Sequence, residues 1–186
     1  MKKFLYLASV LCLFSLSAAA QKADFSGTWK LDPANSKIGG MPIESMTMTV
    51  EQTEAELSVT TATKRAAPPA DGSGGRPGGG GGGRGMGGGM GGGLGDGKTV
   101  YNLTGKETTV EVDGPNGKMP VKLKAARDGA TLKLSSSRSF SGPMGDITIT
   151  TSEKWTLSAD GTKLTVEREQ ATPRGAMTST LVFNKG

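Results

Sequence analysis

Short runs in which apolar and polar residues alternate follow one another along most of this chain, and this period-two pattern predicts strands. Turn signals such as Asn116-Gly117 and Asp160-Gly161 separate the runs. The expected strands lie near 24–32, 46–52, 57–63, 99–104, 108–113, 118–126, 131–140, 147–157, 162–170 and 178–184. A meander of this many strands avoids free edges by closing on itself. We therefore expect one all-β domain, a single antiparallel up-and-down β-barrel of about eight to ten strands.

Four turns allow a test of this pattern, because a one-residue slip would move every apolar side chain to the opposite face. A two-residue turn at Asp160-Gly161 predicts Leu157 opposite Leu164 and Trp155 opposite Val166. Similar turns at Asp128-Gly129, Asn116-Gly117 and Thr53-Glu54 predict three further apolar pairs, which are Ala125 with Leu132, Val112 with Val121, and Val50 with Leu57. All four hairpins place their apolar residues on one shared face.

Residues 1–20 have the composition of a secretion signal. Lys2 and Lys3 precede an uncharged apolar run at 4–16, and three alanines at 18–20 form an A-x-A cleavage site. The run is about 13 residues long against the ~20 of a membrane-spanning helix, which makes an uncleaved anchor the weaker alternative. Val10 and Leu11 before Cys12 argue against lipidation. We expect an exported protein, periplasmic or extracellular, whose domain at 21–186 is monomeric and not integral to a membrane.

Residues 64–98 differ in composition from the rest of the chain. Between Gly72 and Gly97 lie 18 of the 30 glycines, so this stretch has little apolar area to offset its backbone entropy. We expect a long disordered loop that interrupts the domain. Outside this segment and the signal, 15 basic residues balance 15 acidic ones, and the net charge of +5 does not indicate a basic binding face. Arg76 and Arg84 lack aromatic neighbours, so no nucleic-acid partner is expected.

The side chains most used in catalysis and metal binding are scarce. The chain has no histidine, and its one cysteine lies in the expected signal. Serines 135–137 therefore have no histidine to activate them, and Glu167 and Glu169 are expected on the outer, solvated face. Zinc and calcium sites are not indicated, while the methionines at 41, 46, 48, 86 and 90 leave Cu(I) handling as a minor alternative. We expect no enzyme, no cofactor and no metal.

Residues 25–31, Phe-Ser-Gly-Thr-Trp-Lys-Leu, resemble the opening Gly-x-Trp strand of lipocalins and fatty-acid-binding proteins. The whole chain is similar to a group of secreted, uncharacterised bacterial lipocalin-like proteins, which add a Lys-Trp-x-Leu segment, here 154–157, and a Thr-x-Glu-Arg strand, here 165–168. This resemblance implies a lipocalin-like barrel and no established activity. The last strand, 179–183, lacks the Arg-x-Tyr pair that fatty-acid-binding proteins offer to a carboxylate, so a fatty acid is not implied.

The inward face contains one predicted polar cluster. The turn at Asp160-Gly161 sets Glu153 opposite Arg168, and Arg138 is in phase with the apolar residues of its own strand. We interpret Arg138 and Arg168 as the anion-selecting end of a partly apolar lumen, with Glu153, Trp29 and Tyr101 as further ligand-binding candidates. The alternative is that the charged residues lie at the wet mouths of the barrel, or that a bulge turns Glu153 outward.

Trp29 also has a purely structural explanation, because a tryptophan on the first strand of a barrel fills one end of the core. Trp155 has the same explanation. The resemblance further implies that Arg168 packs over the Trp29 ring.

Together these patterns predict non-catalytic binding of a small hydrophobic or amphipathic ligand in the lumen. The alternative is a structural or interaction module of the cell envelope whose barrel is fully packed and binds nothing. The number of strands separates the two, since eight strands can be filled by side chains whereas ten leave room for a ligand.

Overall fold

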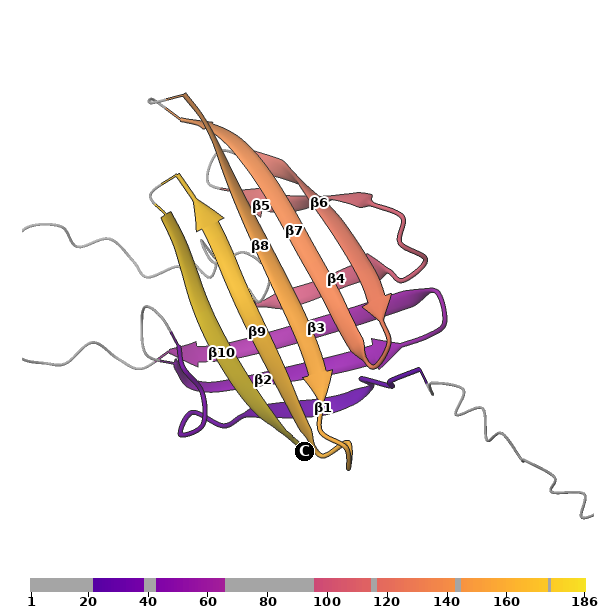
Figure 1. Ribbon diagram of the computed structural model, residues 1–186. Helices are drawn as coiled ribbons and strands as arrows, with labels where there is room; N and C mark the ends of the chain where they lie inside the picture. The colour runs from indigo at the N-terminus through magenta and orange to yellow at the C-terminus, as the bar shows by residue number, and fades with distance from the viewer. Residues whose placement is uncertain (1–21, 39–42, 66–95, 115–116, 143–144, 174) are drawn as a thin grey trace, which may run out of the picture.

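The structure is a computed structural model that describes residues 22–38, 43–65, 96–114, 117–142, 145–173 and 175–186. Its ten strands form one antiparallel sheet (Figure 1). They are β1 (Gly27–Leu31), β2 (Ile43–Gln52), β3 (Glu56–Arg65), β4 (Gly97–Asn102), β5 (Thr108–Gly114), β6 (Gly117–Asp128), β7 (Thr131–Gly142), β8 (Gly145–Leu157), β9 (Lys163–Thr172) and β10 (Gly175–Lys185). The predicted signal at 1–20 lies outside the described residues. In the part of the chain that is described, no helix is long and apolar enough to cross a membrane.

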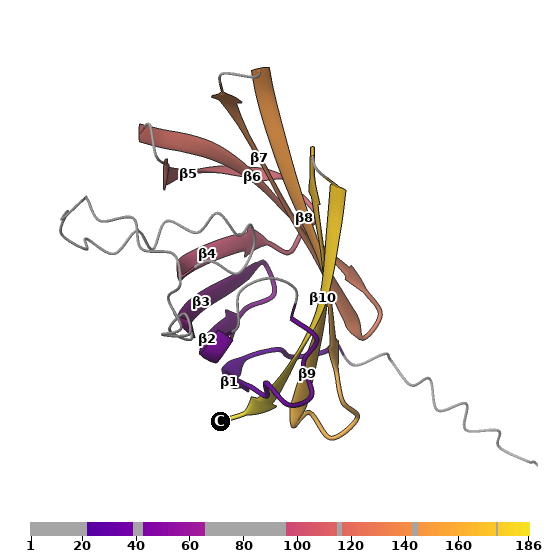
Figure 2. The same ribbon diagram turned by 90° about the vertical axis from the view of Figure 1, so that its left-hand side faces the viewer.

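The sheet closes between its first and last strands. Its order is β4-β3-β2-β1-β10-β9-β8-β7-β6-β5, and β1 pairs with β10 so that Leu31 lies opposite Phe183. The two edges are β4 and β5, which follow each other in sequence but do not pair, so the segment between them at 103–107 joins two edges instead of forming a hairpin. Figure 2 shows this break in the sheet. The fold is a nearly closed up-and-down barrel, which confirms the predicted fold class.

One of the four predicted registers is confirmed and three are wrong by two residues. Leu157 lies opposite Leu164 and Trp155 opposite Val166, although the connection is longer than a two-residue turn and is closed by a 2.9 Å bond from Ser158 N to Lys163 O. The other hairpins pair Ala125 with Leu134, Val110 with Val121, and Val50 with Val59. A shift of two residues leaves each side chain on its predicted face.

The turn between β6 and β7 gives the physical reason for one of these shifts. Asp128 pairs with Thr131, so the two turn residues are Gly129 and Ala130. Gly129 has φ +58°, a left-handed backbone that glycine adopts without steric cost. The prediction had placed this glycine in the second turn position, whereas the chain uses it in the first.

Strands extend into both ends of the segment that was predicted to be a disordered loop at 64–98. Lys64 and Arg65 belong to β3, and Gly97 and Lys98 belong to β4. The Asp96 carboxylate accepts a 2.6 Å hydrogen bond from the backbone N–H of Thr63. Because β3 and β4 pair, the segment between them joins neighbouring strands. Residues 66–95 lie outside the described residues.

The end of the barrel that holds the C-terminus is tightly packed. Trp29 and Trp155 are both 0% exposed, and the ring of Phe25 meets that of Trp155 edge to face at 6.1 Å. The Trp29 Nε1–H donates to the Phe25 carbonyl at 2.9 Å. The core role predicted for both tryptophans is confirmed. The cation over the Trp29 ring is Lys185, with Nζ 5.2 Å from the centroid, so the prediction that Arg168 covers it is wrong.

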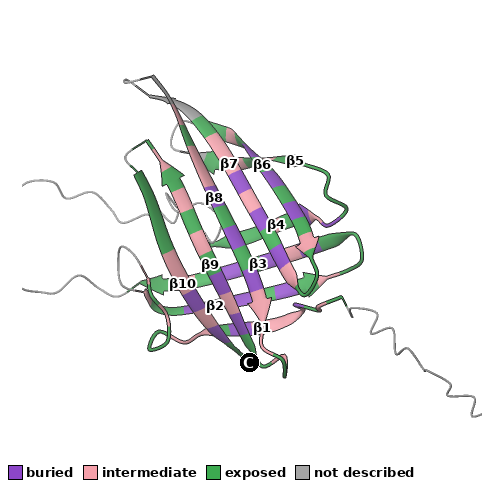
Figure 3. Cartoon of the chain, viewed as in Figure 1, coloured by how far each residue is buried: buried purple, intermediate pink, exposed green. Residues whose placement is uncertain are grey.

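Burial decreases toward the opposite end of the barrel (Figure 3). The inward residues Val110, Val112 and Ile149 are partly buried there, and Met177 is 55% exposed. Met46 and Met48, which had suggested a copper site, are buried in the apolar core, while residues 41, 86 and 90 lie outside the described residues. The barrel therefore has a closed, packed end and an end whose inner wall is partly exposed to solvent.

The buried Trp29 should contribute strongly to stability. We expect Trp29→Ala to lower the free energy of unfolding by about 3–5 kcal/mol, because it leaves a cavity in the packed end. The control is Lys30→Ala on the exposed face of the same strand, which should cost less than about 0.5 kcal/mol. Urea unfolding measures both, and equal losses for the two variants would contradict the packing described above.

Candidate functional site

Cross-strand pairing arranges the inward residues of β7 to β10 in rows, and three successive rows define the candidate site. Of these three, the row nearest the packed end is apolar and consists of Leu132, Trp155, Val166 and Leu181. The next row, here called the ionic row, consists of Leu134, Glu153, Arg168 and Ser179. The third, here called the polar row, consists of Ser136, Thr151, Gln170 and Met177. Polarity thus changes abruptly, within one step along each strand.

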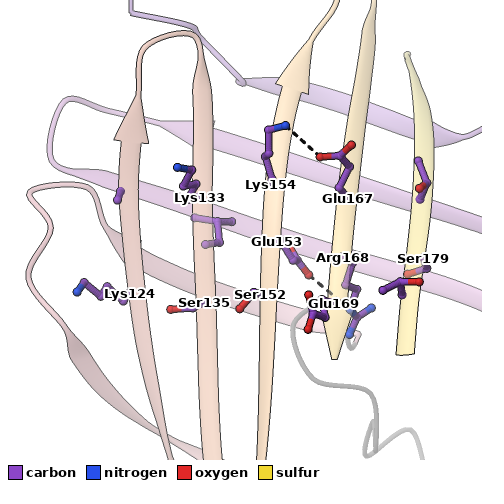
Figure 4. Close-up of a pocket in the computed structure, with 14 residues that line it drawn as sticks. Lys124, Lys133, Ser135, Ser152, Glu153, Lys154, Glu167, Arg168, Glu169 and Ser179 are labelled. Atoms are coloured by element: carbon purple, nitrogen blue, oxygen red, sulfur yellow. Dashed lines mark hydrogen bonds and ion pairs between the residues drawn. The ribbon is translucent and has the colours of Figure 1, made fainter. Parts of the chain in front are cut away.

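Glu153 and Arg168 form an ion pair inside the barrel. The Arg168 Nε lies 3.7 Å from the Glu153 Oε1, and their side chains are 15% and 3% exposed (Figure 4). The predicted pairing is confirmed. The alternative in which Glu153 lies at a wet mouth or turns outward at a bulge is wrong, because the β8–β9 register is regular from Thr150 to Leu157.

Trp155 connects this pair to the packed end of the barrel. Its Nε1–H donates a 2.9 Å hydrogen bond to the Glu153 Oε2, and the two residues share a face because they are two positions apart on one strand. The other oxygen, Oε1, has no hydrogen-bond partner in the described part of the protein. The Glu153 carboxylate is therefore fixed through one oxygen, while the other makes the longer contact with Arg168.

The environment of Glu153 favours its uncharged form. Burial raises the pKa of this carboxyl above its ordinary value, while the charge of Arg168 and the hydrogen bond from Trp155 oppose that shift. Burial also lowers the pKa of the Arg168 guanidinium, against the charge of Glu153, but an arginine stays protonated in proteins. A proton entering this pair would thus go to Glu153.

Tyr101 and Arg138 lie within electrostatic reach of the pair. Tyr101 is 3% exposed on β4, and burial followed by the charge of Glu153 raises the pKa of its phenol. Burial followed by the like charge of Arg168 lowers the pKa of Arg138 on β7. The structure therefore brings together four of the residues predicted from the sequence, and their binding of a ligand stays a prediction.

Trp29, the fifth predicted residue, lies elsewhere. It pairs with Lys185, well along β10 from Ser179 in the ionic row, and it is fully buried in the packed end. We therefore place Trp29 beneath the candidate site, as part of its support.

The Arg168 side chain has hydrogen-bonding capacity left over. It contacts Glu153 through Nε, and no described residue accepts a hydrogen bond from its terminal amino groups. A guanidinium presents its nitrogens in a planar fork that matches carboxylate, sulfonate and phosphate groups. Glu153 thus positions Arg168 from one side, and the remaining nitrogens can bind an anion.

The polar row was not predicted as part of the site. Thr151 is 1% exposed, and its Oγ1, like the Nε2 of Gln170, has no hydrogen-bond partner among the described residues. Buried polar groups of this kind are unusual and call for an explanation. The signal that would have found them is the alternation itself, because Thr151 and Gln170 lie two positions from Glu153 and Arg168 on the same face.

An open hollow of about 610 Å³ lies along β6 to β10, and its lining combines the ionic row with residues of the outer face (Figure 4). The exposed side chains that line it belong mainly to the outer face, among them Lys124, Lys133 and Lys154. Glu167 and Glu169 lie there, exposed, as predicted, and Glu167 pairs with Lys154 at 3.1 Å. The outer charges are solvated and compensate one another, and they do not converge on one point, so we place the candidate site at the ionic row and not on the outer face.

Comparison with known proteins gives one similar structure. No family model matches the chain, and no curated protein matches it. The zebrafish ileal bile acid-binding protein, crystallised with cholic acid, is similar with 14% sequence identity and a TM-score of 0.45. The match covers 87% of this chain and 98% of that one. At this TM-score the likeness by itself assigns neither a fold nor a ligand to this chain.

The hydrogen bond between Trp155 and Glu153 makes the tryptophan a reporter of the carboxyl. In a Trp29→Phe background, we expect the emission of Trp155 to change as the pH falls, with a midpoint above the ordinary glutamate value of 4.5 because burial raises the pKa. Adding Glu153→Gln should abolish the transition. A midpoint at or below 4.5 would contradict the burial described above.

The raised pKa of Glu153 also determines how the free energy of unfolding depends on pH. Between pH 4.5 and the raised pKa, the folded protein holds a proton that the unfolded chain has lost. The contribution of Glu153 to the free energy of unfolding should therefore increase as the pH falls through that range, and Glu153→Gln should remove this increase.

Proposed function

We propose that this barrel is an exported, non-catalytic protein that binds a small amphipathic molecule with an anionic group in its lumen. The observation that supports this most directly is the ionic row, in which a buried carboxylate orients Arg168 while its terminal nitrogens meet no acceptor among the described residues. Export rests on the composition of residues 1–20.

The interior charge favours an anion. Arg168 faces the Glu153 carboxylate, whose uncharged form is favoured by burial, and Arg138 lies within electrostatic reach of Arg168. Toward the open end the apolar side chains of Val110, Val112 and Ile149 are partly exposed and could cover the apolar part of a ligand. A mostly apolar cavity with a few convergent polar groups is the usual form of a small-molecule site.

A purely structural role explains the ionic row less well. A buried ion pair seldom stabilises a protein more than apolar side chains of the same size would, so its presence in a barrel interior favours a binding role. The barrel has ten strands, and a barrel of ten strands is wide enough to hold a ligand where side chains do not fill it, which supports the proposal. The packed end is the feature that favours the alternative, an envelope module that binds nothing.

Catalysis is not part of the proposal. The chain contains no histidine to activate a serine or threonine. Glu167 and Glu169 are exposed on the outer face and do not face another carboxylate across a cleft, as glycoside hydrolysis requires.

The proposal predicts that an amphipathic sulfonate binds in the lumen. We expect anilinonaphthalene sulfonate to gain fluorescence with the protein, and Arg168→Met to weaken its binding about tenfold or more, because a charge-assisted hydrogen bond contributes about 1.5–3 kcal/mol. Dodecyl sulfate should displace the dye, and dodecyltrimethylammonium should not.

The matched control is Lys124→Met, which removes the same charge from the exposed outer face. Circular dichroism verifies that both variants fold. Equal dye affinity for the two variants, or no binding by the unaltered protein, would contradict the proposal and favour the envelope module.

A further inference from the structure

The contact between Glu153 and Arg168 is long for a buried ion pair. At 3.7 Å it exceeds hydrogen-bond length, and Glu153 Oε1 has no other partner in the described part of the chain. Oε2, by contrast, is held at 2.9 Å by Trp155. One oxygen of a carboxylate that is 3% exposed is therefore placed inside the barrel without a donor of its own.

The groups around Glu153 come from several strands. Arg168 on β9 is its direct partner, Tyr101 faces it from β4, and Arg138 on β7 acts on Arg168. The nearest inward positions of β7 and β10 are Leu134 and Ser179, which do not titrate. Trp155, on the same strand, is a donor that does not titrate either. Glu153 is thus the acidic group of this cluster whose protonation burial favours, because burial raises its pKa above the ordinary value.

We propose that the barrel takes up a proton together with its anionic ligand and that Glu153 is the proton acceptor. This inference rests on the proposed function. An anion on the terminal nitrogens of Arg168 places a second negative charge beside a buried carboxylate. A proton from solvent then binds Oε1, Oε2 continues to accept from Trp155, and the charge of Arg168 is left to the anion.

The direction of the effect follows from charge and from linkage. Burial already raises the pKa of Glu153, and a nearby anion raises it further. If bound anion increases the affinity of Glu153 for a proton, then the bound proton increases the affinity for the anion by the same factor. Affinity for a permanently ionised anion should therefore increase as the pH falls.

The test uses the unaltered protein and anilinonaphthalene sulfonate, whose sulfonate stays ionised throughout. We expect binding at about pH 5 to be at least fivefold tighter than at about pH 8, the lower end of typical coupling factors. Calorimetry in two buffers with different ionisation enthalpies should detect the uptake of up to one proton. Glu153→Gln should abolish both effects, while Glu169→Gln on the outer face should retain them.

The possible outcomes distinguish failure of the proton coupling from failure of the proposed ligand binding. Binding that is independent of pH and takes up no proton would overturn the proton coupling and leave the proposed function intact. No binding at any pH would overturn both. If Glu153→Gln fails to fold, the calorimetry of the unaltered protein still decides, because it needs no variant.

Discussion

The cross-strand pairing of β8 with β9 is the constraint on which the interior depends. Leu157 with Leu164 and Trp155 with Val166 fix the register, and the same register places Glu153 opposite Arg168 inside the barrel. A one-residue slip would expose these apolar pairs together with the ionic row. Such a slip would cost about 25 cal/mol for each Å² of apolar surface that it exposes. This cost keeps the register in place, and the register keeps Glu153 and Arg168 buried although burying charged groups is unfavourable.

Much of the fold follows from the period-two pattern, because it fixes which face each residue takes even where the turn is misjudged. The hairpins at Ala125, Val110 and Val50 are shifted by two residues, yet their faces are as predicted. The break between β4 and β5 was not predicted, since local alternation says nothing about which neighbouring strands pair. Likewise, only the fold shows that Tyr101 comes near Glu153 and that Lys185 covers Trp29.

The ionic row lies between a packed end of the barrel and an end whose inner wall is partly exposed. The packed end supports Trp155, which holds one oxygen of Glu153, and Glu153 in turn orients Arg168. Each of these contacts fixes the next, so the proposed site would lose little conformational entropy on binding a ligand. Toward the open end the inner wall is partly exposed, so a ligand could reach Arg168 without unfolding the core.

The most direct measurement is a double-mutant cycle on the free energy of unfolding with Glu153→Gln and Arg168→Met at neutral pH. The account predicts a coupling above about 1 kcal/mol, because the pair is largely buried. The neighbouring cross-strand pair Lys154 and Glu167 is exposed on the outer face of the same two strands and supplies the control, with less than about 1 kcal/mol. Additive effects at Glu153 and Arg168, to within about 0.5 kcal/mol, would contradict an ion pair inside the barrel.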